Sequence, residues 1–217
     1  MKHAHRILVS VMSLVILSAV SCGPAVGAEE EGFVPLFDGK TLDGWEKHGG
    51  PAVYSVEDGT ILGEVRPGRG NTFLCTKKEY ADFILELEVK LDVPGNSGIQ
   101  FRSHIREKGD RVFGYQCEID PSKRAWSGGI YDEARRGWLY SLKDKEDARK
   151  AFKVDDWNKY VIKAVGNSLK TWVNDVPCAD LTDDADASGI IALQVHAGGQ
   201  GKIRWRNIRI KELGGKK

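Results

Sequence analysis

Two runs, N-S-G-I-Q-F-R-S at residues 96–103 and G-Y-Q-C-E-I-D at residues 114–120, decide the fold that this sequence predicts. In both runs apolar and polar residues alternate, which is typical of strands with one buried and one open face. Ile99 and Phe101 fall on the buried face of the first run. Tyr115, Cys117 and Ile119 fall on the buried face of the second. Each run therefore predicts a strand with one buried and one open face.

The open face of these two strands carries an unusual set of polar groups. An ordinary solvated sheet face with Thr, Lys and Ser would be expected there, and a purely structural pair of strands with one wet face is the simplest interpretation. The sequence instead places amide, guanidinium and carboxylate groups on this face. They are Gln100, Arg102, Gln116, Glu118 and Asp120. If the strands share a sheet, these side chains can converge on a polar ligand.

The rest of the chain predicts further short strands separated by Gly- and Asn-rich turns. One charged segment, Lys143 to Phe152, reads as a helix on the surface. Many short alternating strands indicate an all-β fold, an antiparallel two-sheet sandwich or jelly roll. The expected strands are Tyr54–Glu57, Thr60–Glu64, Phe73–Cys75, Phe83–Leu91, Gly98–Ser103, Tyr115–Ile119, Lys159–Val165, Leu169–Val173, Ile190–His196 and Ile203–Lys211.

The first 28 residues have the features of a secretory signal peptide. Lys2 and Arg6 precede a run without charge, which is too short to span a bilayer as a helix of ~20 apolar residues. We expect cleavage after Ala28, which leaves residues 29–217 as a single domain and predicts a periplasmic or secreted protein. A bacterial lipoprotein box at 19–22 offers an alternative in which Cys22 carries a lipid anchor.

The composition of residues 29–217 excludes several classes of protein. Without Lys2 and Arg6 the chain has 30 basic and 31 acidic residues, so charge gives no argument for binding nucleic acid or an anionic membrane. No transmembrane segment is expected. Cys75, Cys117 and Cys178 are too few for a disulfide framework, and Cys117 is predicted to be a small buried apolar residue.

The order of the motifs along residues 33–213 resembles the 3-keto-disaccharide hydrolase domain family. The motifs are F-V-P-L-F-D-G-K-T-L-D-G-W at 33–45, N-S-G-I-Q-F-R, G-Y-Q-C-E-I-D, G-G-I-Y-D, D-W-N-K-Y-V-I-K-A-V-G-N, W-V-N-D-V-P, I-I-A-L-Q-V-H-A-G-G and I-R-W-R-N-I-R-I-K-E-L. The resemblance implies a concanavalin A-like jelly-roll sandwich of the lectin and glucanase type, with a carbohydrate on its concave sheet. This agrees with the strands read from the residues.

Several residues outside the two central runs are expected to reach the same face. Gln194 and His196 share one face of a late strand, and Tyr131 and Asp132 follow a Gly-Gly turn. Trp126 and Trp138 flank that turn and could stack on a sugar or pack on the sandwich edge. His196 alone could equally be a structural histidine.

The segment E-I-D at 118–120 resembles the start of the E-I-D-x-x-E motif of laminarinase-type glucanases. Those enzymes need two carboxylates close together for a retaining mechanism. Here Pro121, Ser122, Lys123 and Arg124 follow Asp120, so the second catalytic carboxylate is absent and Pro121 interrupts strand pairing. A retaining glucanase is therefore not expected.

The family name implies a reaction that needs only one base. A ketone at C3 of a pyranose acidifies the C2 proton, and its removal expels the C1 oxygen by β-elimination before water adds. We assign His196 or Glu118 as the base and Arg102 as the group that stabilises the enolate. A divalent cation held by acidic groups is an alternative stabiliser, and no other cofactor is expected. Gln100, Gln116, Asp120, Tyr131, Asp132, Trp138 and Gln194 would bind the small carbohydrate substrate.

Two other classes of function stay open at the level of sequence. The same face could belong to a carbohydrate-binding module without turnover, or to a structural or cell-surface interaction domain. The sequence gives no information on the sugar, the linkage, a metal requirement or the oligomeric state. The resemblance implies an enzyme that cleaves 3-keto-glycosides, and the chemically varied residues of the polar face are compatible with such a site.

Overall fold

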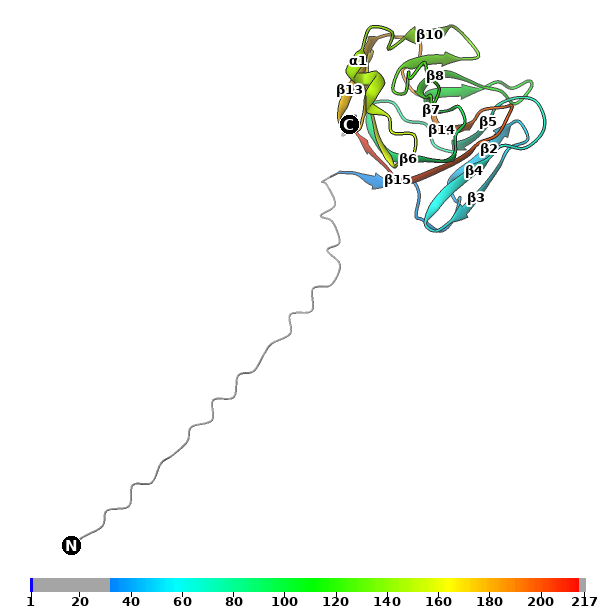
Figure 1. Cartoon of the computed structure of the whole chain (residues 1–217). Helices are drawn as coiled ribbons and strands as arrows, with labels where there is room; N and C mark the ends of the chain where they lie inside the picture. Colours follow the sequence, from blue (N-terminus) through cyan, green and yellow to red (C-terminus); the bar gives the residue numbers. More distant parts are fainter. Residues whose placement is uncertain (2–31, 215–217) are drawn as a thin grey trace. The chain divides into compact units, whose positions relative to one another are not determined.

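A computed structural model of the chain describes Met1 and residues 32–214, and the expected signal peptide and lipid-anchor cysteine lie almost wholly outside these residues. Residues 32–214 belong to one compact unit. It consists of two antiparallel sheets and a single short helix within the described residues, so the predicted two-sheet sandwich is confirmed (Figure 1).

One sheet has eight strands in the order β13-β12-β11-β6-β15-β4-β3, with β1 also paired to β15, and the other has seven in the order β10-β9-β8-β7-β14-β5-β2. The elements are β1 (Val34–Pro35), β2 (Trp45–Gly49), β3 (Val53–Glu57), β4 (Thr60–Glu64), β5 (Thr72–Thr76), β6 (Phe83–Val93), β7 (Ser97–Ile105), β8 (Val112–Ile119), β9 (Ile130–Glu133), β10 (Gly137–Tyr140), α1 (Glu146–Ala151), β11 (Asn158–Val165), β12 (Ser168–Val173), β13 (Val176–Thr182), β14 (Ile190–Val195) and β15 (Lys202–Glu212).

The core lies between the inner faces of the two sheets. On β6 every second residue from Phe83 to Leu91 is buried, while the residues between them are part-exposed, as the period of a strand requires. Ile99, Phe101 and Tyr115 close the core from β7 and β8, where Phe101 stacks on Tyr115 with ring centroids 5.5 Å apart. Each such fully buried side chain stabilises the fold by roughly 1.5–3 kcal/mol.

The outer face of the seven-stranded sheet is formed by the opposite set of residues. In register across this sheet lie Glu118 on β8, Gly98 on β7, Gln194 on β14, Phe73 on β5 and His48 on β2. Paired residues of an antiparallel ladder point to the same side, so this row defines one continuous surface. The predicted polar face is thus a face of a real sheet.

The hairpin between β7 and β8 bends over part of this outer face. The pairing of the two strands shifts between Gln100 and His104, where Arg102 adopts a φ of 45°. The bend brings Val112 onto Phe73, in a small apolar cluster with Cys75, Ile190 and Ala192. The hairpin tip reaches β2, where Asp110 accepts a 2.9 Å hydrogen bond from the Gly49 N–H. One part of the outer face is therefore covered and the other is open.

Candidate functional site

The open part of the outer face forms a pocket of about 500 Å³ at the ends of β8 and β14. Its volume lies within the range of small-molecule sites. Six of the residues predicted to bind or transform a sugar line it, namely Gln116, Glu118, Asp120, Tyr131, Trp138 and His196, and Asn96, Ser122 and Arg124 complete the wall. The structure thus brings together residues that are up to 100 positions apart in the sequence.

Glu118 lies on the floor of this pocket with only 4% of its surface exposed. Burial raises the pKa of its carboxyl group to about 7, even though three donors oppose the rise. Asn96 Nδ2 donates to Oε1 at 2.7 Å and Gln116 Nε2 donates to Oε2 at 2.8 Å. The charge of Arg124 also lowers the pKa. A carboxyl group with this pKa can take up and release a proton near neutral pH.

Gln116 is held in place by two glutamines beneath the pocket. Gln100 Nε2 and Gln194 Nε2 both donate to Gln116 Oε1, at 2.6 and 2.8 Å, so the Gln116 amide must turn its own Nε2 toward Glu118. Gln100 and Gln194 were predicted to bind substrate, but both are fully buried and neither lines the pocket. Their position is therefore corrected: they orient Gln116, which is the residue that the pocket exposes.

Asp120 and Arg124 form the polar rim next to Glu118. Arg124 Nε donates to Asp120 Oδ2 at 2.7 Å, and Arg124 Nη2 donates to Glu118 Oε1 at 3.2 Å. Burial raises the pKa of Asp120, but hydrogen bonds from Ser122, from Arg124 and from the Trp126 N–H outweigh it and lower the pKa overall. Two neighbouring carboxyl groups whose pKa values are driven apart are typical of sites with separate acid–base roles.

An aromatic wall adjoins this rim. Trp138 makes edge contacts with Trp126 at 4.7 Å and with Tyr131 at 5.2 Å between ring centroids. The Arg124 guanidinium lies 4.9 Å from the Trp138 ring and 5.2 Å from the Trp126 ring. Trp138 and Tyr131 are half-buried and line the pocket, so each offers part of a ring surface to a sugar.

His196 stands at the opposite edge of the pocket and is exposed. Its Nδ1 lies 2.7 Å from the Ala197 carbonyl oxygen, which can only accept a hydrogen bond, so Nδ1 carries a proton. The lone pair of the neutral ring is then on Nε2. His196 and Glu118 are thus two titratable groups on one pocket, as the sequence predicted, and their catalytic roles remain predictions.

Arg102 does not reach the pocket, and its predicted place there is wrong. The bulge at this residue inverts the alternation, so the side chain is buried on the other side of the sheet. Its guanidinium donates to Asp82 Oδ1 at 2.8 Å and to the carbonyl oxygens of Ala81 and Gly166 at 2.7 Å. Arg102 therefore ties loops together inside the fold, and Arg124 is the arginine at the pocket.

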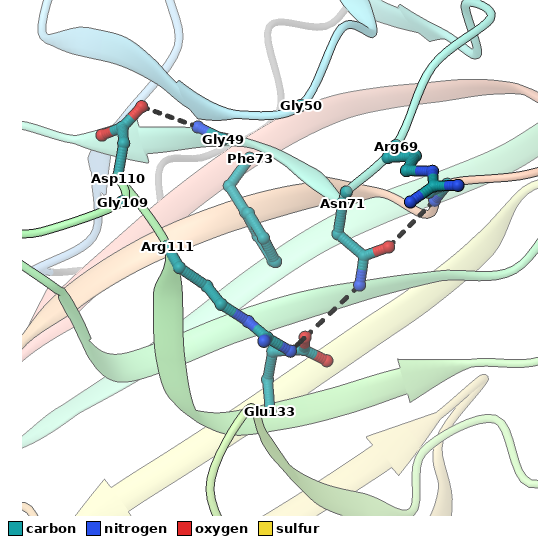
Figure 2. Close-up of a pocket in the computed structure, with 11 residues that line it drawn as sticks. Gly49, Gly50, Arg69, Asn71, Phe73, Gly109, Asp110, Arg111 and Glu133 are labelled. Atoms are coloured by element: carbon teal, nitrogen blue, oxygen red, sulfur yellow. Dashed lines mark hydrogen bonds and ion pairs between the residues drawn. The ribbon is translucent and has the colours of Figure 1, made fainter.

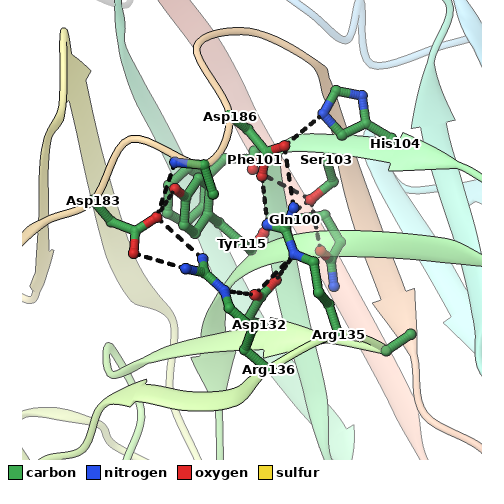
Figure 3. A network of polar contacts seen from close by, with 12 residues as sticks. Gln100, Phe101, Ser103, His104, Tyr115, Asp132, Arg135, Arg136, Asp183 and Asp186 are labelled. Carbon is green, nitrogen blue, oxygen red and sulfur yellow. Dashed lines mark hydrogen bonds and ion pairs between the residues drawn. The ribbon is translucent and has the colours of Figure 1, made fainter.

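Asp132 is also misplaced by the prediction. It follows Tyr131 on β9, and adjacent strand residues point to opposite faces, so Asp132 is fully buried while Tyr131 lines the pocket. Figure 3 shows it at the centre of a separate network, where Arg135 Nε donates to both carboxylate oxygens and Arg136 is a second partner. These arginines also pair with Asp183 and Asp186, which fastens the 183–186 loop to β9.

Within residues 32–214, no group of three or more His, Cys, Asp or Glu side chains is arranged to hold a metal ion. Over the same described residues, no helix combines the length and apolar character that crossing a membrane requires. Arg124, with hydrogen bonds to both Glu118 and Asp120, supplies the positive charge next to these carboxylates.

Residues 32–211 match the model of the 3-keto-alpha-glucoside-1,2-lyase-like domain family, which is a class of carbohydrate-related proteins. The chain belongs to this family. A curated relative, the 3-keto-disaccharide hydrolase of Bacteroides thetaiotaomicron, is 36% identical over 80 residues, which make up 33% of this chain and 27% of that protein. The match thus spans about a quarter of the relative's length.

Solved structures share the fold at low sequence identity. A candidate glycosyl hydrolase from Parabacteroides distasonis has a TM-score of 0.64 at 20% identity, over 85% of this chain and 95% of that one. A β-1,3-1,4-glucanase from a mouse hindgut metagenome has a TM-score of 0.54 at 14% identity, over 83% and 97%. The carbohydrate-binding module CBM66 of Bacillus subtilis has a TM-score of 0.51 at 16% identity, over 78% and 96%. These likenesses confirm the jelly-roll fold.

Proposed function

We propose that this protein is an exported enzyme that cleaves 3-keto-glycosides by elimination at C1 and C2, followed by hydration. The observation that carries this proposal is Glu118, a buried carboxyl group on the floor of a sugar-sized pocket with a pKa of about 7. The family match and the name of the Bacteroides relative supply the substrate class. Cleavage through one base also fits this pocket, because Asp120, the carboxylate beside Glu118, is bound to Arg124.

Glu118 is the proposed general base. In its ionised form it takes the C2 proton, which the neighbouring C3 ketone acidifies, and the C2–H electron pair becomes the enolate. The hydrogen bonds from Asn96 and Gln116 fix both carboxylate oxygens, so the base is oriented before substrate binds. A base with a pKa near the working pH combines a large ionised fraction with useful basicity.

Arg124 is the proposed stabiliser of the developing negative charge, in place of Arg102. Its guanidinium already lies between carboxylate oxygens and the faces of two tryptophans, where its position is restrained. A fixed positive charge near the C3 oxygen lowers the energy of the enolate relative to the ketone. Tyr131 and Trp138 would pack against the apolar face of the sugar ring.

In the second half of the reaction the leaving alcohol departs, water adds at C1 and C2 is reprotonated. The enolate collapses, a C1=C2 double bond forms, and the C1–O bond breaks, so the leaving alcohol takes a proton. His196, at the far edge of the pocket, donates this proton from Nε2 in its protonated form, and the neutral ring then takes a proton from the water that adds at C1. Glu118, once its proton has exchanged with solvent, protonates C2, which restores the 3-keto-sugar and leaves the enzyme unchanged.

A carbohydrate-binding module without turnover is the second candidate, supported by the aromatic wall alone. Turnover separates the two. The wild-type chain should cleave a 3-keto-glucoside and leave the parent glucoside intact. Its kcat/KM should fall as the pH drops below about 7, because Glu118 becomes protonated there. Glu118→Gln should lower kcat by roughly 10²–10⁴-fold, whereas Glu79→Gln, at an exposed site, should not. Binding of the 3-keto-glucoside without any cleavage would contradict the enzymatic proposal.

A further inference from the structure

A second pocket, of about 530 Å³, lies on the same outer face under the tip of the β7–β8 hairpin. Nothing in the elimination chemistry above uses it. Figure 2 shows Arg111 extending from the hairpin toward Glu133 of β9, with Asn71 beyond it and Phe73 at the back. The pocket thus combines one apolar surface with a carboxylate, an amide and a guanidinium, the pattern of a site for a polar organic ligand.

The polar groups of this second pocket are held in fixed positions. Asn71 Nδ2 donates to Glu133 Oε1 at 3.3 Å, and Asn71 Oδ1 accepts from the Ala197 N–H at 2.9 Å. Arg111 Nη2 lies 3.8 Å from Glu133 Oε1. Glu133 is 7% exposed, and burial raises its pKa against the opposing effects of Arg111, Asn71 and His196. Hydrogen bonds donated by the hydroxyl groups of a ligand would stabilise a carboxylate that is so poorly solvated.

The wall opposite Arg111 is rigid because backbone lies directly against backbone. A Cβ atom on Gly50 would be 2.0 Å from the Gly70 carbonyl oxygen, and one on Gly49 would be 2.4 Å from that of Asn71. No larger residue fits at either position without moving the chain. Only glycine fits at both positions, so the backbone of this wall is closely packed.

The two pockets adjoin each other along one surface. Tyr131 lines the first pocket and Glu133 the second, and as residues i and i+2 of β9 they point to the same face, roughly 7 Å apart. His196 lines the first pocket and its neighbour Ala197 lines the second. The charge of His196 also influences the carboxyl group of Glu133. A ligand that extends past His196 from the first pocket enters the second.

We propose that the second pocket binds the leaving sugar of a disaccharide substrate while the 3-keto ring occupies the Glu118 pocket. This inference rests on the proposed function, since the site of proton abstraction decides which ring lies where. Arg69 also lines this pocket (Figure 2). Glu133 and Asn71 accept hydrogen bonds from the hydroxyls of the leaving sugar, and Arg111 and Arg69 donate to them. His196, between the pockets, is then adjacent to the glycosidic oxygen.

Binding measurements on the full chain test this assignment. The probes are 3-keto-maltose and 3-keto-cellobiose, oxidised on the non-reducing ring, and the methyl α- and β-3-keto-glucosides, titrated calorimetrically into Glu118→Gln. We expect one disaccharide to bind at least about tenfold more tightly than its methyl glycoside. Arg111→Ala and Arg69→Ala, introduced separately into that variant, should reduce this ratio to within about twofold. Lys163→Ala, exposed on β11 of the other sheet, is the control and should preserve it.

The outcomes separate this inference from the proposed function. Three results would overturn the second site. The first is equal affinity for disaccharide and methyl glycoside in both linkages. The second is an affinity ratio of disaccharide to methyl glycoside that survives Arg111→Ala and Arg69→Ala, and the third is no binding of any probe. Absence of cleavage of all four compounds by the wild type would instead overturn the enzymatic proposal. In that case the same titrations on the wild type still decide whether the second pocket holds a sugar. Both arginines are exposed, so their removal leaves the core packing intact.

Discussion

Replacement of Glu118 by Gln should remove the loss of stability that the wild type undergoes as the pH rises through neutrality. The carboxyl group is 4% exposed, and burial raises its pKa from 4.5 to about 7. The variant keeps the shape of the side chain and can still accept from Gln116, but it carries no charge and turns its Nε2 toward the donors of Asn96 and Arg124, a cost that does not change with pH. The stability of the wild type should therefore depend on pH in a way that the variant lacks.

The sign and size follow from proton linkage. Below pH 4.5 the carboxyl group is protonated in the folded and the unfolded chain, so the difference between the two proteins is constant. As the pH rises to about 7, the unfolded chain releases a proton that the folded chain retains, and the wild type loses stability relative to the variant. A pKa shift of this size corresponds to about 3 kcal/mol, which for a chain of this length is about 6–12 °C in Tm.

Thermal and urea unfolding from pH 4 to 9 would measure this difference. The free energy of unfolding of Glu118→Gln minus that of the wild type should rise by about 3 kcal/mol between pH 4 and 8 and then level off. Glu79→Gln changes the net charge equally at an exposed position and serves as the control. Parallel stability curves for wild type and Glu118→Gln across this range would refute the raised pKa and, with it, the choice of Glu118 as base.

Three further predictions concern the aromatic wall, Arg102 and the N-terminus. Trp138→Ala should raise KM by about 3–10-fold, since aromatic contacts contribute about 0.5–1.5 kcal/mol, and an unchanged KM would exclude sugar stacking on Trp138. Arg102→Ala should lower the free energy of unfolding by about 1.5–3 kcal/mol because Asp82 and the carbonyl oxygen of Ala81 lose their buried donor, and a urea titration that gives a wild-type midpoint would contradict this. Protein exported by a bacterial host should begin near Glu29 by N-terminal sequencing; a lipid-modified Cys22 would favour the anchored form, and an intact Met1 would refute export.

The alternation of apolar residues was sufficient to predict the two-sheet architecture, because a strand buried on one face leaves a period of two in the sequence. Phe83 to Leu91 and the runs around Ile99 and Tyr115 show this directly. The pattern missed β1, β2, β9, β10 and β13. In β2 the sequence W-E-K-H-G has only Trp45 buried, so pairing with β5 rather than composition makes it a strand. The predicted helix is confirmed in shorter form as α1, with Ala148 and Ala151 buried.

The candidate site was predictable where the strands are regular and unpredictable where they are not. Regular alternation on β8 correctly placed Gln116 and Glu118 on one pocket. Strict alternation of faces failed to place Arg102, because the residue pattern does not reveal the bulge there. The bulge inverts the face on which the strand residues beyond it are expected. Arg124 was missed as a site residue because it follows β8 on a loop, and only the return of that loop brings it to Glu118. Its spacing of four residues from Asp120 was the one available signal.

Exchange at C2 tests the central claim most directly. The wild-type chain, incubated with a 3-keto-glucoside in deuterated water, should give product that carries deuterium at C2, because the carbanion formed by Glu118 is reprotonated from a group in equilibrium with solvent. Glu118→Gln should lower the rates of both exchange and cleavage by roughly 10²–10⁴-fold. Cleavage with no deuterium at C2, or equal cleavage of the unoxidised glucoside, would show direct displacement at C1 and would contradict the elimination mechanism.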